Sequence, residues 1–148
     1  MKVDFYVLEE TSKLPSLRFV CTLIENAYAN SEPVYVHTAS KEEAERIDTL
    51  MWTYRDDSFL PHHLYDPTDD CAPLIQIGYA DTPKQQQGVL VNLTNTLPAF
   101  YMQFTRVIEI VFSDPVWQQL ARERFRLYRE NSCELTTHKV KSANDMSN

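Results

Sequence analysis

The order of strand-like and helix-like segments in the first third of the chain constrains the fold most. Residues 3–9 (VDFYVLE) and 33–39 (PVYVHTA) are short runs rich in β-branched and aromatic residues, as is typical of strands. Each is followed by apolar residues at helical spacing, over residues 16–31 behind a Ser16 cap and over residues 41–52. Strands that alternate with helices pair in parallel through right-handed crossovers, so this order predicts an α/β sheet.

The rest of the chain continues the pattern after a long polar connection over residues 53–73. The expected elements are strands at 74–80, 88–94 and 105–112, a short helix within 95–104, and a last helix over 114–131 with Asp114 as its cap and Pro115 at its first position. We predict a single three-layer α/β/α domain with a central mixed, largely parallel sheet. The polar residues from Thr136 onward are expected to fray, so the domain is placed at 1–137 and a flexible tail at 138–148.

Several classes of protein are disfavoured by what the sequence lacks. Loops that cradle phosphates need glycines, but the chain has only two and contains neither GxxxxGK[ST] nor GxGxxG. Its three cysteines are far apart and show no CxxC spacing. No apolar run approaches the roughly 20 residues that span a bilayer, and the N-terminus resembles a strand and not a signal peptide. We therefore expect a cytoplasmic protein.

A cluster of potential metal ligands lies in residues 62–71, HHLYDPTDDC. It comprises His62, His63, Asp66, Asp69, Asp70 and Cys71. Adjacent histidines normally point in different directions, and the spacing matches no helical zinc motif. The favoured interpretation is a solvated loop, and neither a metal nor a cofactor is expected. The chain also has no GxSxG elbow, although a catalytic triad assembled in space leaves an enzyme as an alternative.

Large apolar residues straddle the end of the second helix and the charged connection that follows. They are Trp52, Phe59, Leu60 and Pro61. Aromatic residues in such a place either close the core or form a protein-binding patch. Composition alone favours the core.

The last helix separates into two faces at 3.6 residues per turn. The face expected to pack on the sheet carries Val116, Leu120, the stem of Arg124 and Leu127, with Trp117, Ala121 and Tyr128 beside it. The other face carries Gln118, Arg122, Phe125, Arg126 and Arg129. An aromatic ring among guanidiniums suits a ligand with both an anionic and an apolar group, whereas the alternative is a solvated helix with snorkelling arginines. A formal net charge of −7 disfavours nucleic acid and favours a short acidic peptide.

Several segments resemble the chi subunit of bacterial DNA polymerase III. They are DFYVLE at 4–9, AERIDTLMWTYRDDSFLPHHL at 44–64, VLVNLTNTLPAFYMQFTRV at 89–107, VIEIVF at 107–112 and QLARERFRLYR at 119–129. The similarity runs from about residue 3 to 137. It implies a non-catalytic accessory subunit with a three-layer α/β/α fold. It also implies two partners: the psi subunit of the clamp loader, bound one-to-one, and the acidic, Phe-terminated C-terminal tail of the single-stranded DNA-binding protein, SSB. Such a subunit links the replicase to SSB-coated DNA, touching DNA only indirectly.

The resemblance implies a role for particular residues in binding the SSB tail. They are Arg122, Phe125, Arg126, Val111, Gln118, Arg129, Leu135 and Thr137. Arg122 would pair with the terminal carboxylate, Phe125 and Val111 would wall the pocket for the terminal Phe, and Arg126 would meet acidic side chains. Leu135 and Thr137 would border the site. Gln118 stands where some relatives carry Lys, so the electrostatic contribution is expected to be smaller or to shift onto Arg129.

A second surface is implied for psi. Trp52, Phe59, Pro61 and His62 match the family region that contacts this subunit. For at least part of this cluster, the resemblance therefore favours a binding patch over a place in the core.

The alternative function is a small cytoplasmic enzyme that binds a phosphate or carboxylate substrate at the arginine-rich helix. The scarcity of glycine and the missing nucleophile motifs disfavour it.

Overall fold

The structure, a computed structural model, describes residues 1–54, 61–66, 74–79, 82–84 and 87–141. Its elements in chain order are β1 (Lys2–Leu8), α1 (Lys13–Ala29), β2 (Val34–His37), α2 (Lys41–Thr53), β3 (His62–Leu64), β4 (Ile75–Gly78), β5 (Val89–Asn92), the 3-10 turn η1 (Tyr101–Gln103), β6 (Arg106–Val111), α3 (Pro115–Glu130) and β7 (Glu134–Val140). The prediction of an α/β domain is confirmed.

The described strands form one seven-stranded sheet in the order β3-β4-β2-β5-β6-β1-β7. Every strand pair in this part of the chain is parallel, so the prediction of a mixed sheet is wrong in that detail. The central strands β2, β5 and β6 are almost wholly buried, as parallel strands covered on both faces require. β3 lies within the stretch expected to be only a surface connection.

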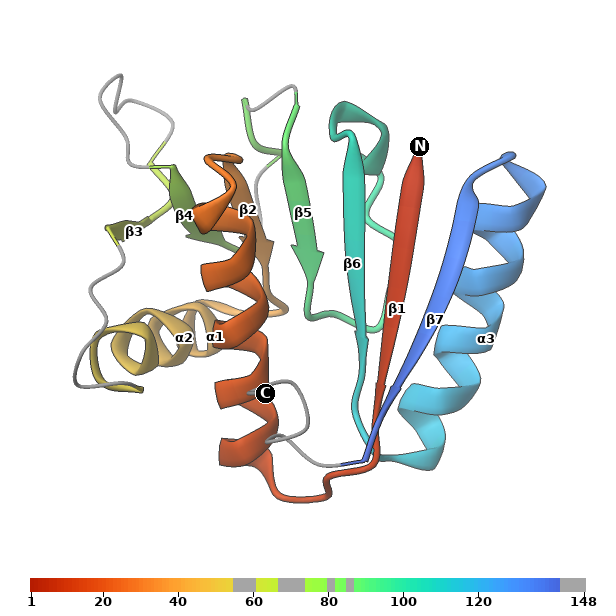
Figure 1. Ribbon diagram of the computed structural model, residues 1–148, viewed down its shortest axis with the longest axis horizontal. Helices are drawn as coiled ribbons and strands as arrows, with labels where there is room; N and C mark the ends of the chain where they lie inside the picture. Colours follow the sequence, from red (N-terminus) through yellow and green to blue (C-terminus); the bar gives the residue numbers. More distant parts are fainter. Residues whose placement is uncertain (55–60, 67–73, 80–81, 85–86, 142–148) are drawn as a thin grey trace.

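Helices cover both faces of the sheet and make three layers. One core cluster joins α1 and α2 to the sheet through residues such as Ile24, Ile47 and Ile108. The other cluster joins α3 and η1 to the opposite face through residues such as Phe5 and Tyr128. Figure 1 shows α3 beside β7, at the end of the sheet far from β3 and β4. No helix in the described ranges is long and apolar enough to cross a membrane.

At the start of two helices a side chain accepts hydrogen bonds from the first backbone N–H groups. The Ser40 hydroxyl accepts a hydrogen bond from the backbone N–H of Glu43, at 3.2 Å, at the start of α2. The Asp114 carboxylate accepts from the backbone N–H groups of Val116 and Trp117, at 2.9 and 3.2 Å, at the start of α3. Side-chain oxygens at this position satisfy N–H groups that have no partner inside the helix.

Two boundaries differ from those predicted. α1 begins at Lys13, so Ser16 is not its cap; Ser16 is buried inside the helix and donates its hydroxyl to the Ser12 carbonyl oxygen, at 2.9 Å. The prediction of a frayed chain from Thr136 is also wrong, because β7 continues to Val140 and pairs with β1 along its whole length. The rest of the expected tail, residues 142–148, lies outside the described residues.

Candidate functional site

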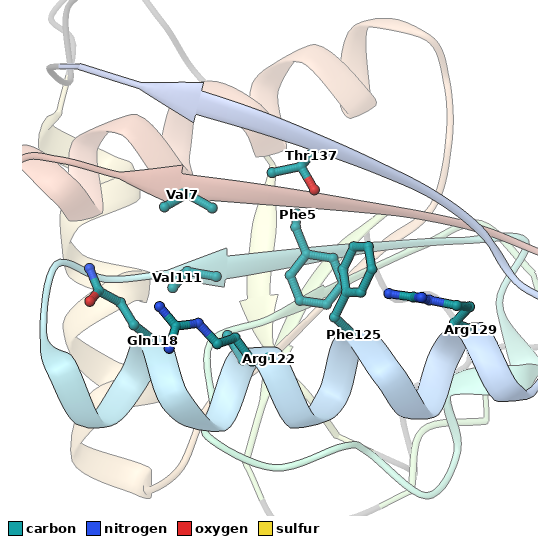
Figure 2. A pocket seen from close by; sticks show the side chains of 9 residues that line it. Phe5, Val7, Val111, Gln118, Arg122, Phe125, Arg129 and Thr137 are labelled. Carbon is teal, nitrogen blue, oxygen red and sulfur yellow. The ribbon is translucent and has the colours of Figure 1, made fainter.

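A hollow of about 460 Å³ lies between α3 and the strands β1, β6 and β7 (Figure 2). It is lined by Phe5, Val7, Val111, Gln118, Ala121, Arg122, Phe125, Arg129 and Thr137. The helix contributes one wall and the three strands contribute the other. The volume is within the range of about 300–1,000 Å³ that is usual for small-ligand pockets.

The register of the sheet brings the strand residues together. In the parallel pairing of β1 with β6, Val7 is opposite Val111. In the pairing of β1 with β7, Phe5 is opposite Thr137. Because alternate residues of a strand share a face, Phe5 and Val7 both point toward α3. The strand side of the pocket is therefore built from β1, β6 and β7, with its apolar residues on β1 and β6.

The helix wall combines one aromatic ring with two cations. The half-buried ring of Phe125 lies 5.3 Å from the ring of Phe5, centroid to centroid, at an angle of 57°. The Arg129 guanidinium carbon lies 5.2 Å from the centre of the Phe125 ring, within cation–π range. Arg122 is exposed and has no ion-pair partner among the described residues, so its charge is available to a ligand.

A buried polar network fixes α3 to the sheet beneath this wall. The Glu109 carboxylate on β6 accepts hydrogen bonds from Arg124 Nε at 3.2 Å, the Tyr128 hydroxyl at 2.7 Å and Asn92 Nδ2 at 3.0 and 3.1 Å. A further hydrogen bond runs from Arg124 Nη1 to the Asn95 carbonyl oxygen at 3.0 Å. Burial raises the pKa of Glu109, and the cation of Arg124 and these hydrogen bonds oppose the rise. Burial also raises the pKa of Tyr128, and the neighbouring Glu109 carboxylate raises it further.

The buried stripe of α3 differs from the predicted one. Ala121, Arg124 and Tyr128 are its buried residues. Val116 and Leu127, expected to pack on the sheet, are 61% and 37% exposed. Arg124 is buried with its guanidinium as well as its stem, because Glu109 supplies a counter-charge in the core.

The structure brings together most of the residues that the resemblance implies for the tail site. Those that line the pocket are Val111, Gln118, Arg122, Phe125, Arg129 and Thr137. Arg126 is exposed on α3 and is not part of the lining, and Leu135 packs against the core cluster under α3. Phe5, Val7 and Ala121 also line the pocket and were not predicted. The alternation of residues 3, 5 and 7 in VDFYVLE was a signal for a shared face, but not for its position beneath α3.

The second predicted patch is only partly within the described residues. The Trp52 side chain is 47% exposed, and its ring centroid is 4.3 Å from that of His62. His62 is buried, and its Nε2 donates to the backbone oxygen of Asp48 at 3.0 Å. Pro61 is half-buried, whereas Phe59 lies outside the described residues. Trp52 therefore presents an open aromatic surface, while His62 supports it from the core.

Of the candidate metal ligands weighed in the sequence, the adjacent His62 and His63 differ in burial. His62 is buried and His63 is exposed, as expected for successive residues of β3. Asp69, Asp70 and Cys71 lie outside the described residues. Across the residues that the structure does describe, no group of three or more His, Cys, Asp or Glu side chains could hold a metal ion.

Similarity to solved structures concerns the fold alone. The chain matches the crystal structure of T4 UvsW with a TM-score of 0.66 at 9% sequence identity. The match covers 95% of this chain but 41% of that one. It shows that the arrangement of strands and helices occurs in another protein, and it carries no information about function.

Similarity in sequence is much more specific. The family model described as DNA polymerase III chi subunit, HolC, matches residues 1–136. The DNA polymerase III subunit chi of Pseudomonas aeruginosa is 33% identical over 94% of this chain and 96% of its own length. The corresponding subunits of Haemophilus influenzae and Escherichia coli are 28% and 25% identical, over 93% and 90% of this chain and 96% and 94% of their own lengths. Since the family model and these relatives cover almost the whole folded domain, the chain belongs to the DNA polymerase III chi subunit family.

Proposed function

We propose that the protein is a non-catalytic accessory subunit of DNA polymerase III that binds the psi subunit and the acidic C-terminal tail of SSB. In DNA replication it would link the polymerase to SSB-coated single-stranded DNA. Its membership of the chi family places it among accessory subunits and not among catalysts. The observation that carries the proposal is the pocket at α3, where Arg122, which has no ion-pair partner among the described residues, stands beside an aromatic wall.

The chemistry of the pocket matches a peptide that ends in Phe. The strand side, with Phe5, Val7 and Val111, offers an apolar surface for an aromatic ring. Arg122 lies on the helix next to this surface and supplies a cation for the terminal carboxylate. Hydrogen bonds between guanidinium and carboxylate are among the strongest in proteins. The pocket would therefore bind both groups of the terminal Phe, its ring on the strand side and its carboxylate at Arg122.

The distribution of charge supports a peptide and not DNA as the direct ligand. Residues 116–141 hold six Lys or Arg and three Asp or Glu, a local charge of +3 in a chain of net charge −7. The remaining residues therefore carry −10 and would repel a polyanion. We place the protein in the cytoplasm, at the nucleoid-associated replisome, where contact with DNA is made through SSB.

The psi subunit is proposed to bind at the other end of the sheet. The exposed face of Trp52 on α2, together with Pro61 and the supporting His62, forms this patch, and Phe59 is included from the family resemblance. Trp is among the residues most often found at the energetic centre of protein interfaces. The tail pocket and the psi patch lie on different elements, so we expect the two partners to bind the protein at the same time.

Two labelled peptides with the sequence of an SSB tail test the tail site, one complete and one without the final Phe. We expect the complete peptide to bind at least about tenfold more tightly, because burying a Phe side chain contributes about 1.5–3 kcal/mol. A third peptide with an amidated C-terminus separates the carboxylate from the ring. Equal affinity for all three would mean that this pocket does not recognise the end of the tail.

A further inference from the structure

Lys139 on β7 faces the same side of the sheet as the residues that line the pocket. Thr137 lines the pocket, and Lys139 follows it by two residues, which places both on one face of the strand. The intervening His138 packs on the other face, where its ring stacks on Tyr6 with centroids 4.5 Å apart. In the pairing of β1 with β7, Lys139 is opposite Val7, itself a pocket residue.

The two walls of the pocket differ in charge. Figure 2 shows Gln118 close to Val111 at one end. At the other end Phe125 lies beside Phe5, and Arg129 packs over the Phe125 ring. Arg122 stands beside the neutral Gln118 at the first end, so both cations of the lining belong to α3 and the strands β6, β1 and β7 contribute none to it. The row of residues Val111, Val7 and Lys139, which runs across β6, β1 and β7, leads from that end to the edge of the sheet.

Lys139 has the properties of a free binding cation. Its side chain is exposed, and no carboxylate among the described residues forms an ion pair with it. β7 is the edge strand, so nothing in the described part of the sheet covers it from the outside. Its side chain is therefore open to solvent at the edge of the sheet next to the pocket.

We propose that Lys139 is a specificity-determining cation of the pocket and binds an acidic side chain upstream of the peptide's terminal carboxylate. The inference rests on the proposed function. The ligand would then lie across the pocket from α3 toward β7, with its carboxylate at Arg122 and its acidic residues directed to the sheet edge. Two interstrand spacings, about 10 Å, separate β6 from β7, which corresponds to about three residues of extended chain. Lys139 thus adds a cation on the sheet side of the pocket, whereas the resemblance implies that the contribution missing at Gln118 shifts onto Arg129.

A mutant cycle between protein and peptide tests this contact. The probe is a labelled acidic peptide that ends in Phe, together with variants in which each Asp or Glu is replaced singly by its amide. We expect Lys139→Gln to weaken binding of the unmodified peptide about threefold, the size typical of an exposed ion pair. One amide variant of the peptide should abolish that difference. Lys41→Gln, an exposed lysine on α2 at the opposite face, is the matched control and should leave the affinity unchanged.

The outcomes separate this inference from the proposed function. If Lys139→Gln binds like the unaltered protein while Arg122→Ala binds weakly, the peptide occupies the pocket without Lys139 and the inference is wrong. The same conclusion follows if Lys139→Gln weakens every amide variant equally, since no side chain is then singled out. If neither Lys139→Gln nor Arg122→Ala affects binding, the proposed function itself fails.

Discussion

Arg124 and Glu109 form a buried ion pair beneath the pocket, with Arg124 Nε 3.2 Å from Glu109 Oε1. The side chains are 3% and 0% exposed, so the pair is isolated from solvent. It connects α3 to β6 and sets the position from which Arg122 and Phe125 line the pocket. A buried charge without a counter-charge destabilises the fold, so removing either partner alone should lower the free energy of unfolding.

Replacing Glu109 by Gln is expected to lower the free energy of unfolding by about 3 kcal/mol, because it leaves the Arg124 guanidinium buried without a counter-charge. Urea unfolding followed by circular dichroism measures this change. The matched control is Glu123→Gln on the exposed side of the same helix, which should change the free energy by less than about 0.5 kcal/mol. Equal effects of the two substitutions would contradict the role given to the pair.

The stability should also depend on Asp4 at acid pH. Its carboxylate accepts from Arg106 Nε at 2.8 Å and lies 3.1 Å from His138 Nε2, which ties β1 to β6 and β7. Burial acts to raise the pKa of Asp4, but the hydrogen bonds from Arg106 and His138 outweigh burial and lower the pKa below its ordinary value. A carboxyl with a lowered pKa in the folded state stabilises the fold above its unfolded pKa, about 4, and this contribution is lost as the pH falls further.

We therefore predict that the free energy of unfolding decreases more steeply below about pH 4 in the unaltered protein than in Asp4→Asn. Urea titrations at a series of pH values from 6 to 3 are the appropriate measurement. Parallel pH profiles for the two proteins would show that Asp4 contributes nothing through its ionisation.

Trp52→Ala should separate the two binding surfaces. The exposed part of the indole is proposed to contact psi, and a central interface Trp typically contributes about 2 kcal/mol or more. We expect the variant to lose co-purification with psi while binding the SSB tail peptide with unchanged affinity. Loss of both activities would mean that Trp52, through its contact with His62, supports the fold and not an interface.

The sequence predicts the interior of the sheet better than its edges. Strands β1, β2, β5 and β6 stand out because buried parallel strands are continuous apolar runs. β3 has only three residues in a stretch rich in Pro and Asp, so no periodicity indicates it. β7, with the sequence ELTTHKV, is an edge strand whose side chains are mostly solvated, and its pairing with β1 is invisible in its composition.

From residue spacing the pocket is predictable only on its helical side, and Val111 and Thr137 on the strand side come from the family resemblance. Gln118, Arg122, Phe125 and Arg129 share one face of α3 because of their helical spacing, which does not depend on the tertiary structure. The predicted stripe includes the stem of Arg124, with Ala121 and Tyr128 beside it, but it also includes Val116 and Leu127, which the structure exposes. The pairing of Arg124 with Glu109 joins two elements and leaves no local signal. The strand side of the pocket depends on sheet register, which the sequence does not specify.

The most direct test of the account is a titration of a labelled SSB tail peptide against the unaltered protein and Arg122→Ala. Arg122 is exposed and unpaired among the described residues, so its removal should leave the fold intact while removing the partner of the terminal carboxylate. We predict a loss of about 1.5–3 kcal/mol in binding free energy, the usual scale for hydrogen bonds to charged groups. The control Arg18→Ala makes the same change of charge on an exposed position of α1 and should have no effect. Unchanged affinity in Arg122→Ala, or an equal loss in Arg18→Ala, would contradict the assignment of the pocket as the tail site.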